Sequence, residues 1–358
     1  MTRLAAKLET MWYSGARPLW LAPLSFLYGA VMALRSLLYR IGLRDRARMP
    51  VPVVVIGNLT VGGTGKTPLV AWLSTHLAAC GLRVGIISRG YGGRASGVTR
   101  VTIHSRPSEV GDEPLLLARR AQATVFVGKD RVAAAREAVA EGADILLADD
   151  GLQHLRLRRD CEIVVIDGQR GFGNQCLLPR GPLREHPRRL RRVNAVVVNG
   201  TVTAPGFQIP KFVSHTLFNM RMRPGDARPV GGGGALRALS SFRGSGVHGV
   251  AAIGNPHRFF DTLREAGLTV YEHAFADHHP FRSGDLNFGD SLPVLMTEKD
   301  AVKCSAFADE RCWYVPVTAD FEESQARALV DLVIARVNAF NASAQAQRTK
   351  PPGKKANG

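Results

Sequence analysis

A glycine-rich run early in the chain combines residue types that bind phosphate groups. Its members are Gly62, Gly63, Thr64, Gly65, Lys66 and Thr67. The run follows an apolar stretch, residues 52–56, that is typical of a buried parallel strand. Glycines let successive backbone N–H groups point into one concavity at the positive end of the following helix. Lys66 would then contact the β- and γ-phosphates of a nucleoside triphosphate, and the Thr67 hydroxyl would ligate Mg²⁺.

One position departs from the usual phosphate-loop pattern G-x-x-x-x-G-K-[ST]. Thr60 stands where the first glycine of that pattern is expected. The glycines at 62, 63 and 65 still allow close approach of the backbone, so we predict that residues 60–67, with Thr60 and Val61 included, bind the nucleotide. A chance glycine-rich turn is the alternative, and the preceding strand argues against it.

Two adjacent acids follow a second apolar stretch. Residues 145–148 are Ile, Leu, Leu and Ala, and Asp149 and Asp150 come directly after them. Ligands of open α/β sheets bind at the carboxyl ends of the strands, so these acids should lie beside the phosphate loop. We predict that both belong to a Mg²⁺ site together with Thr67. Asp149 is our first choice for direct contact, and the choice between the two acids stays open.

Transfer of a phosphoryl group also requires a group that takes the proton of the acceptor. Asp112 begins a predicted helix, where an Asp commonly acts as the N-cap, and the residues alone favour that role. A loop at residues 273–279 carries the densest group of histidines. Zinc binding is conceivable there, but a catalytic histidine fits better because no matching ligand set lies nearby. The basic run 180–192 either clamps an anionic substrate or forms a solvated face.

The composition is that of a globular protein with a strongly basic charge. The chain has 358 residues, 45% hydrophobic content and a net charge of +17. Such a charge attracts nucleic acid, an anionic membrane or a phosphorylated substrate. The five cysteines show no CxxC pair, which favours neither zinc nor disulfides and suggests a reducing, cytosolic setting.

The N-terminal segment predicts contact with a membrane. Residues 18–34 carry no charge, and Arg35, Arg40, Arg44, Arg46 and Arg48 follow them. Arginine flanks with nearby aromatic residues favour a helix that lies in the cytoplasmic leaflet. The run is slightly short for a spanning helix, and no cleavage site for a signal peptide follows it. An amphipathic helix packed on the protein is the alternative.

The order of elements predicts an α/β fold with a mostly parallel sheet and helices on both faces. We divide the chain into a membrane-associated helix region (1–48), a phosphate-loop nucleotide-binding domain (49–210), a β-ribbon linker (211–245), a smaller α/β domain (246–320), a C-terminal helix (321–340) and a disordered tail (341–358).

Several segments, in this order along the chain, resemble one family closely: tetraacyldisaccharide 4'-kinase, the lipid A 4'-kinase of Gram-negative bacteria. They are residues 55–68 (VIGNLTVGGTGKTP), 88–93 (SRGYGG), 111–114 (GDEP), 149–154 (DDGLQH), 178–185 (LPRGPLRE), 275–279 (FADHH) and 297–300 (TEKD). Thr60 also resembles the family's own form of the loop.

The resemblance implies ATP-dependent phosphorylation of the 4' hydroxyl of a tetraacyldisaccharide 1-phosphate, which gives lipid IV-A. It also implies that Asp112 and His278 act together as the general base, with His279 as the less favoured partner of Asp112. This implication replaces the N-cap role that the residues alone favour for Asp112. Arg184 and Glu185 resemble family residues near the substrate, as does Tyr91. The family implies the cytoplasmic face of the inner membrane, and we expect a monomer.

Two other classes of function compete with a kinase. A phosphate-loop GTPase or metallochaperone would read guanine through N-K-x-D, but Lys299 and Asp300 are adjacent, so the spacing of residues 297–300 is wrong. A nucleic-acid binder would explain the charge of +17. No nucleic-acid recognition motif is present, however, and the basic residues cluster beside apolar, membrane-type sequence. We therefore expect no nucleic-acid partner.

Overall fold

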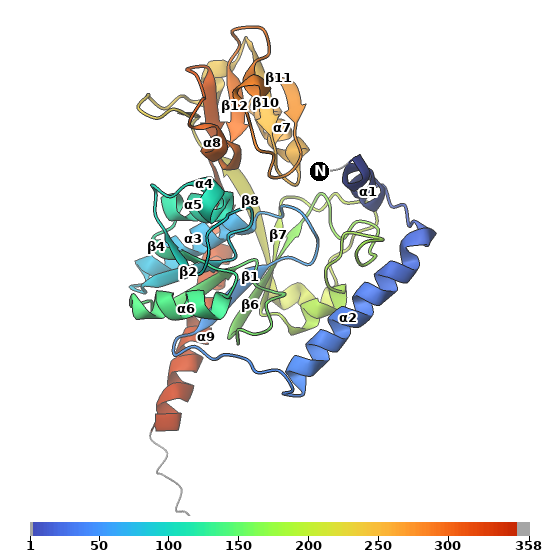
Figure 1. Cartoon of the computed structure of the whole chain (residues 1–358), viewed down its shortest axis with the longest axis vertical. Helices are drawn as coiled ribbons and strands as arrows, with labels where there is room; N and C mark the ends of the chain where they lie inside the picture. Colours follow the sequence, from blue (N-terminus) through green and yellow to red (C-terminus); the bar gives the residue numbers. More distant parts are fainter. Residues whose placement is uncertain (1–2, 349–358) are drawn as a thin grey trace, which may run out of the picture.

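A nine-stranded sheet organises most of the chain. The computed structural model describes residues 3–348 (Figure 1). The strands stand in the order β14-β8-β7-β6-β1-β5-β2-β4-β3, and only β3 and β14 run antiparallel to their neighbours. Their bounds are β1 Val53–Gly57, β2 Val84–Ser88, β3 Thr99–Val101, β4 Ala123–Val127, β5 Ile145–Asp149, β6 Cys161–Asp167, β7 Ala195–Asn199, β8 Leu217–Pro224 and β14 Val317–Phe321.

Helices cover both faces of this sheet. Helices α3 (Lys66–Ala79), α5 (Asp112–Arg120) and α9 (Glu323–Arg348) pack on one face, and α6 (Arg131–Ala140) packs on the other. Strand β1 is buried on both sides, since Val54 and Ile56 join one core while Val53 and Val55 join the other. A short helix, α4 (Pro107–Val110), precedes α5. The expected parallel α/β sheet with helices on both faces is confirmed.

A five-stranded sheet forms the smaller unit. Its order is β11-β10-β12-β13-β9, and its core includes Phe242 and Phe260. The elements are β9 Arg228–Pro229, β10 Gly246–Ala251, α7 Pro256–Glu265, β11 Thr269–Ala274, β12 Val294–Thr297, α8 Glu298–Cys304 and β13 Cys312–Val315. Short 3-10 helices lie at Leu19–Leu21, Pro187–Arg192, Lys211–Thr216, Leu239–Phe242 and Ser283–Leu286.

A two-stranded ribbon connects the sheets. The chain leaves the large sheet through β8 and returns through β14, which pairs with β8 in antiparallel register (Figure 1). The second strand of the ribbon therefore comes from residues 317–321, outside the expected linker range of 211–245. Residues 312–321 form two strands in different sheets, β13 and β14, which are separated by Pro316. Proline has no N–H for a sheet ladder, which suits a position between two strands.

The N-terminal region consists of α1 (Arg3–Tyr13), which the sequence analysis does not predict, and α2 (Ala22–Arg40). One side of α2 contacts the body of the protein: Ser25 Oγ donates to the Leu177 carbonyl at 2.9 Å. The opposite side is exposed, with Phe26 81% accessible, and Trp20, in the 3-10 helix before α2, is 65% accessible. Figure 1 shows α2 running along the outside of the large sheet's unit. The helical segment 19–40, with mean hydropathy 1.5, is long and apolar enough to cross a membrane.

Two further differences concern β7 and the C-terminus. Strand β7 is not among the elements expected from the sequence, although Val196, Val197 and Val198 form the same kind of continuous apolar run as the other strands. Helix α9 continues to Arg348, past residue 341 where disorder is expected. Residues 349–358 of the expected tail lie outside the described chain.

Candidate active site

The glycine-rich loop connects the end of β1 to the start of α3, at the carboxyl edge of the large sheet. Gly65 is the N-cap of α3 and has φ +94°. A Cβ at this position would lie 2.6 Å from Asn199 Nδ2, which is held by its bond to the Thr64 carbonyl, so both the backbone conformation and the close approach favour glycine. Gly62, with φ +97°, also has a conformation that other residues rarely adopt.

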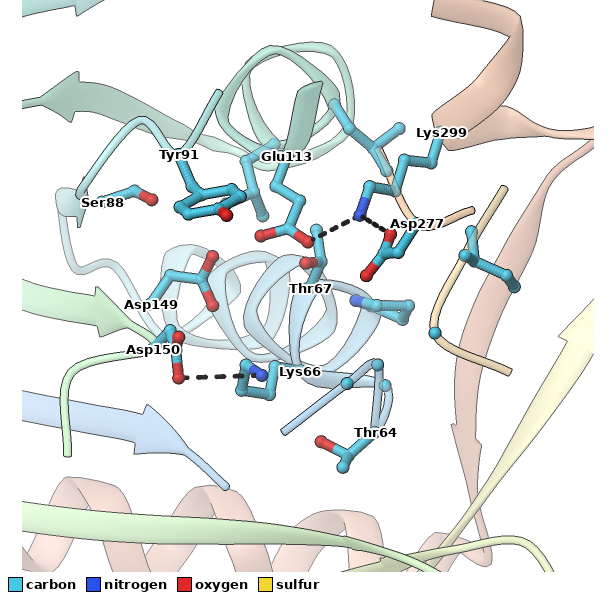
Figure 2. A pocket seen from close by; sticks show the side chains of 18 of the residues that line it. Thr64, Lys66, Thr67, Ser88, Tyr91, Glu113, Asp149, Asp150, Asp277 and Lys299 are labelled. Carbon is cyan, nitrogen blue, oxygen red and sulfur yellow. Dashed lines mark hydrogen bonds and ion pairs between the residues drawn. The ribbon is translucent and has the colours of Figure 1, made fainter. Parts of the chain in front are cut away.

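The loop faces a cavity of about 870 Å³ that both sheets help to enclose. Figure 2 shows Lys66, Asp149 and Asp150 on one side of this cavity and Asp277 and Lys299 on the other. The predicted site residues that line it are Gly62, Gly63, Thr64, Gly65, Lys66, Thr67, Tyr91, Asp149, Asp150, Arg184 and His278.

Lys66 reaches across the loop toward the acidic strand end. Its ammonium group donates to Asn58 Oδ1 at 3.1 Å and lies 3.7 Å from Asp150 Oδ1. Among the described loop residues, Thr60 and Val61 lie outside the cavity lining. Thr60 forms a β-bridge with Leu183, and the Val61 N–H donates to the Pro182 carbonyl. These two residues therefore anchor the loop to the 182–184 segment and do not face the cavity.

Asp149 is a buried carboxylate whose bonding capacity is unused. It is 1% exposed, and neither carboxylate oxygen has a hydrogen-bond partner within the described chain. Burial, and then the nearby charge of Glu113, raises the pKa of Asp149 to about 7. Buried polar atoms are nearly always paired in folded proteins, so two orphaned oxygens facing a cavity fit a cation-binding role. Mg²⁺ prefers such oxygen ligands, and the Thr67 hydroxyl lines the same cavity.

Asp150 differs from its neighbour because it is already paired. The Arg184 guanidinium donates to its two oxygens at 3.1 Å and 3.0 Å. Although burial acts in the opposite direction, Lys66 and Arg184 lower the pKa of Asp150 to about 2. Glu185 lies outside the described cavity lining and contacts Arg189 at 3.4 Å, and burial raises the pKa of this carboxyl. Of the adjacent pair Arg184 and Glu185, only the arginine faces the site.

Asp112 and His278 meet although they are far apart in sequence. His278 Nδ1 lies 3.3 Å from Asp112 Oδ2. Asp112 is the first residue of α5, but Gly111 is the N-cap and no side-chain cap hydrogen bond forms. The N-cap role, which the residues alone favour, is therefore wrong. Lys299 Nζ lies 3.4 Å from His278 Nε2, and because an ammonium can only donate, Nδ1 carries the proton toward Asp112.

The neighbouring candidates take different positions. His279 pairs with Asp285 at 3.0 Å and so does not contact Asp112. The Tyr91 ring lies 5.0 Å from the His278 ring, between centroids, and is 65% exposed at the cavity mouth. The loop at 273–279 does not form a metal centre: within residues 3–348, no three His, Cys, Asp or Glu side chains are grouped to hold an ion.

A second cluster of charges, to which the sequence analysis assigns no role, crosses the cavity. Lys299 of α8 donates to Glu113 of α5 at 3.1 Å and to Asp277 at 3.2 Å (Figure 2). Burial opposes this, but the two carboxylates raise the pKa of Lys299. Glu113 and Lys299 belong to segments 111–114 and 297–300, which carry the family resemblance, so the sequence points to both residues. Their contact with each other depends on tertiary packing and has no sequence signal.

Arg131 is another residue that the sequence analysis does not identify. It begins the alanine-rich helix α6, is 6% exposed, and donates to the Asp150 carbonyl at 2.8 Å. Burial lowers the pKa of this guanidinium, and the nearby Asp150 and Asp149 charges oppose that shift. Its position beneath the acidic pair adds positive charge where phosphates would bind.

Comparison with known proteins identifies the family. The family described as "Tetraacyldisaccharide-1-P 4'-kinase" (LpxK) matches residues 17–335 of this chain. The chain belongs to this family. Its similarity to named family members extends over nearly the whole length of both chains. The tetraacyldisaccharide 4'-kinase of Alkalilimnicola ehrlichii is 51% identical over 321 residues, which covers 89% of this chain and 93% of the relative. The relative from Methylobacillus flagellatus is 46% identical over 333 residues, covering 92% and 95%.

A solved structure of the family has the same fold. The crystal structure of LpxK from Aquifex aeolicus, described as in complex with ATP, superposes with a TM-score of 0.72 at 27% identity. The match covers 88% of this chain and 98% of that chain. The shared fold therefore extends over most of this chain.

Proposed function

We propose that this chain is an ATP-dependent, Mg²⁺-requiring kinase that phosphorylates the 4' hydroxyl of a tetraacyldisaccharide 1-phosphate to form lipid IV-A. One observation carries the proposal. The phosphate loop with Lys66 and Asp149 lines one cavity together with His278, and the Asp112 carboxylate, which lies outside the cavity lining, is 3.3 Å from this histidine. Family membership supports the same activity, because the relatives are named for it.

The large sheet's unit holds the nucleotide in this proposal. The backbone N–H groups of residues 62–65 and the Lys66 ammonium bind the phosphates, while Thr60 and Val61 fix the loop from behind. Thr67 and Asp149 would hold Mg²⁺ directly, and Asp150 would position the site through Arg184 and Lys66. The ion would neutralise charge on the transferred phosphoryl group.

Asp112 and His278 take the proton of the acceptor. The 4' oxygen forms a bond to the γ-phosphorus, the bond from that phosphorus to the bridging oxygen of ADP breaks, and the hydroxyl proton passes to the Asp112 carboxylate. His278 donates its Nδ1 proton to the same carboxylate, which keeps the acid oriented and stabilises its charge.

Arg184 and Tyr91 are the predicted substrate residues that line the cavity. An exposed aromatic ring at the mouth suits a sugar face, and a guanidinium suits an anionic group. Glu185 was predicted beside the substrate, but its carboxylate contacts Arg189. Its effect on substrate would therefore be indirect, through the position of the 184–189 segment.

Helix α2 supports membrane association. Its apolar side chains are exposed along one side; those more than half accessible include Leu24, Phe26, Leu27, Val31 and Leu34. A monomer in water rarely exposes such a surface, whereas a lipid interface would cover it. We propose that α2 lies on the cytoplasmic leaflet of the inner membrane, where the lipid substrate is found. The helix also contacts the site, since the Tyr28 hydroxyl donates to the Arg184 carbonyl at 3.0 Å. We propose a monomer without a nucleic-acid partner.

The direct test is incubation of the whole chain with γ-labelled ATP, Mg²⁺ and the disaccharide 1-phosphate in detergent. The proposal predicts a labelled lipid with a second phosphate and no transfer without Mg²⁺. An Asp112→Asn variant should bind ATP like the wild type and turn over at least about 10²-fold more slowly. Label that appears only as free phosphate would contradict the proposal and favour an NTPase switch. Replacing ATP by GTP in the same assay separates the kinase from the GTPase alternative.

A further inference from the structure

A lysine of the smaller unit also lies near Asp112. Lys303, near the end of α8, has its ammonium nitrogen 3.9 Å from Asp112 Oδ2. It also lies 2.8 Å from Asp300 Oδ1 and 5.1 Å from the centre of the Phe281 ring. Its side chain is only 10% exposed. The roles proposed above do not use this lysine.

The lysine is held from behind by a fixed carboxylate. Asp300 is fully buried and accepts hydrogen bonds from the Ala252 N–H at 2.9 Å and from the Thr297 hydroxyl at 2.6 Å. These bonds fix Asp300 to the ends of β10 and β12. The ion pair with Asp300 in turn restricts the position of the Lys303 ammonium. The ammonium has no well-oriented hydrogen-bond partner within the described chain, although it is buried. A buried charge without such a partner depends on the field of nearby opposite charges, here the two carboxylates.

The geometry points to Lys303 as a positioning residue for the base: its ammonium stabilises the negative charge of the Asp112 carboxylate and keeps it directed toward His278. This inference rests on the proposed role of Asp112. The titratable groups that face Asp112 are the His278 imidazole from the loop after β11 and the Lys303 ammonium from α8. Its helix neighbour Glu113 faces Lys299, which also contacts Asp277, so these three charges are largely satisfied among themselves.

The location of the lysine gives the contact a further consequence. Asp112 belongs to the large sheet's unit, whereas Lys303 and His278 belong to the smaller one. Lys303 and His278 therefore reach the carboxylate only when the two units are in contact. An opposite charge at about 4–6 Å typically changes the proton affinity of a carboxyl by about 1–3 pH units. The lysine would thus stabilise the negative charge of Asp112 only in the assembled site.

The test compares the pH dependence of kcat in the wild type, Lys303→Met and Lys303→Arg. Without the cation the base should bind its proton more readily, so the acidic limb for Lys303→Met should move to higher pH by about 1 unit or more. The KM for ATP should change less than about threefold, because Lys303 lies away from the phosphate loop. Lys303→Arg keeps the charge and should keep the limb near its wild-type position. Arg264→Met, which removes an exposed cation of the same unit, controls for net charge.

The double variant Lys303→Met with Asp300→Asn distinguishes an effect of Lys303 on Asp112 from a purely structural role of Lys303. This variant removes the buried carboxylate that Lys303→Met alone leaves without its cation. If the lysine only neutralises Asp300, the double variant returns to the wild-type pH profile, and the inference is overturned. If the lysine acts on Asp112, the acidic limb stays shifted in the double variant. The double variant also serves if Lys303→Met alone does not fold.

Failure of this inference and failure of the proposed function give different results. An inactive wild type, or an Asp112→Asn variant with wild-type turnover, would refute the proposed function. An active wild type whose acidic limb is unchanged in Lys303→Met would refute only the role of the lysine.

Discussion

Replacing Asp149 by Asn tests whether one buried carboxyl controls when the site can hold Mg²⁺. Asp149 is 1% exposed, and burial, followed by the charge of Glu113, raises its pKa to about 7. The metal binds the ionised carboxylate, so it must displace a proton from every molecule that carries one. At pH 7 about half of the molecules carry that proton.

The size of the effect follows from this pKa. Between pH 8 and pH 6 the protonated fraction rises from about one-tenth to about nine-tenths, so the apparent Kd for Mg²⁺ should rise about tenfold. This factor corresponds to about 1.4 kcal/mol of binding free energy. Asp150 should not contribute: although burial opposes them, Lys66 and Arg184 hold its pKa at about 2, far below this range.

The measurement is titration calorimetry of Mg²⁺ into the protein with a non-hydrolysable ATP analogue at pH 6, 7 and 8. Buffers with different ionisation enthalpies report the protons released. The wild type should release about half a proton more at pH 7 than Asp149→Asn, whose value accounts for titration of the nucleotide itself. Equal proton release and equal pH dependence in the two proteins would refute the reasoning.

The same carboxyl should affect the stability of the metal-free protein. Its pKa in the folded chain, about 7, lies above the ordinary value of 3.8, so the folded chain binds the proton more tightly than the unfolded chain. The resulting stabilisation is complete below about pH 4 and is lost as the pH rises to about 7. Asp149→Asn stays neutral, so at pH 8 with a chelator it should be more stable than the wild type by up to about 4 kcal/mol. Urea unfolding at pH 5 and pH 8 measures this difference, which should grow with pH.

Three further predictions concern the loop, the core and the membrane helix. In Gly254→Ala the new Cβ would collide with the Gly63 backbone nitrogen, so the KM for ATP should rise at least about tenfold with little change in stability. An unchanged KM would show that the smaller unit does not touch the loop during binding. Leu73→Ala, fully buried in α3, should lower the free energy of unfolding by about 2–5 kcal/mol in urea titrations, and a loss below about 1 kcal/mol would contradict the observed packing. Phe26→Glu should lower the affinity for lipid vesicles, measured by co-sedimentation, at least about tenfold. The control Ile103→Glu, at another exposed apolar residue, should not lower it. Equal losses would argue against α2 as the membrane contact.

Much of the site could be predicted from the sequence because its parts are local. The phosphate loop depends on glycines within a few residues of one another and on the strand before them, and Gly62 and Gly65 adopt the positive φ values that such a loop requires. The strand that ends at Asp149 is likewise a continuous apolar run followed by acids. Strand β7 carries the same signal and could have been found with it.

The division of roles within adjacent pairs could not be predicted in this way. Asp149 and Asp150 are neighbours of identical type, yet one is an orphaned, buried carboxylate and the other is bound by Arg184. The difference arises because β5 ends between them and Asp150 turns out of the strand with φ +47°. His278 and His279 also diverge, since each meets a different acid.

The sequence alone determined the phosphate loop, the acidic strand end and the parallel α/β order, because each rests on contacts between residues close in the chain. Tertiary structure alone decided which distant groups come into contact at the site. Asp112 and His278 are 166 positions apart, and Glu113 and Lys299 are 186 apart. Such pairs meet only after β8 and β14 bring the smaller sheet over the loop. Charges separated by this much chain interact through the packed fold, whose geometry no local pattern records.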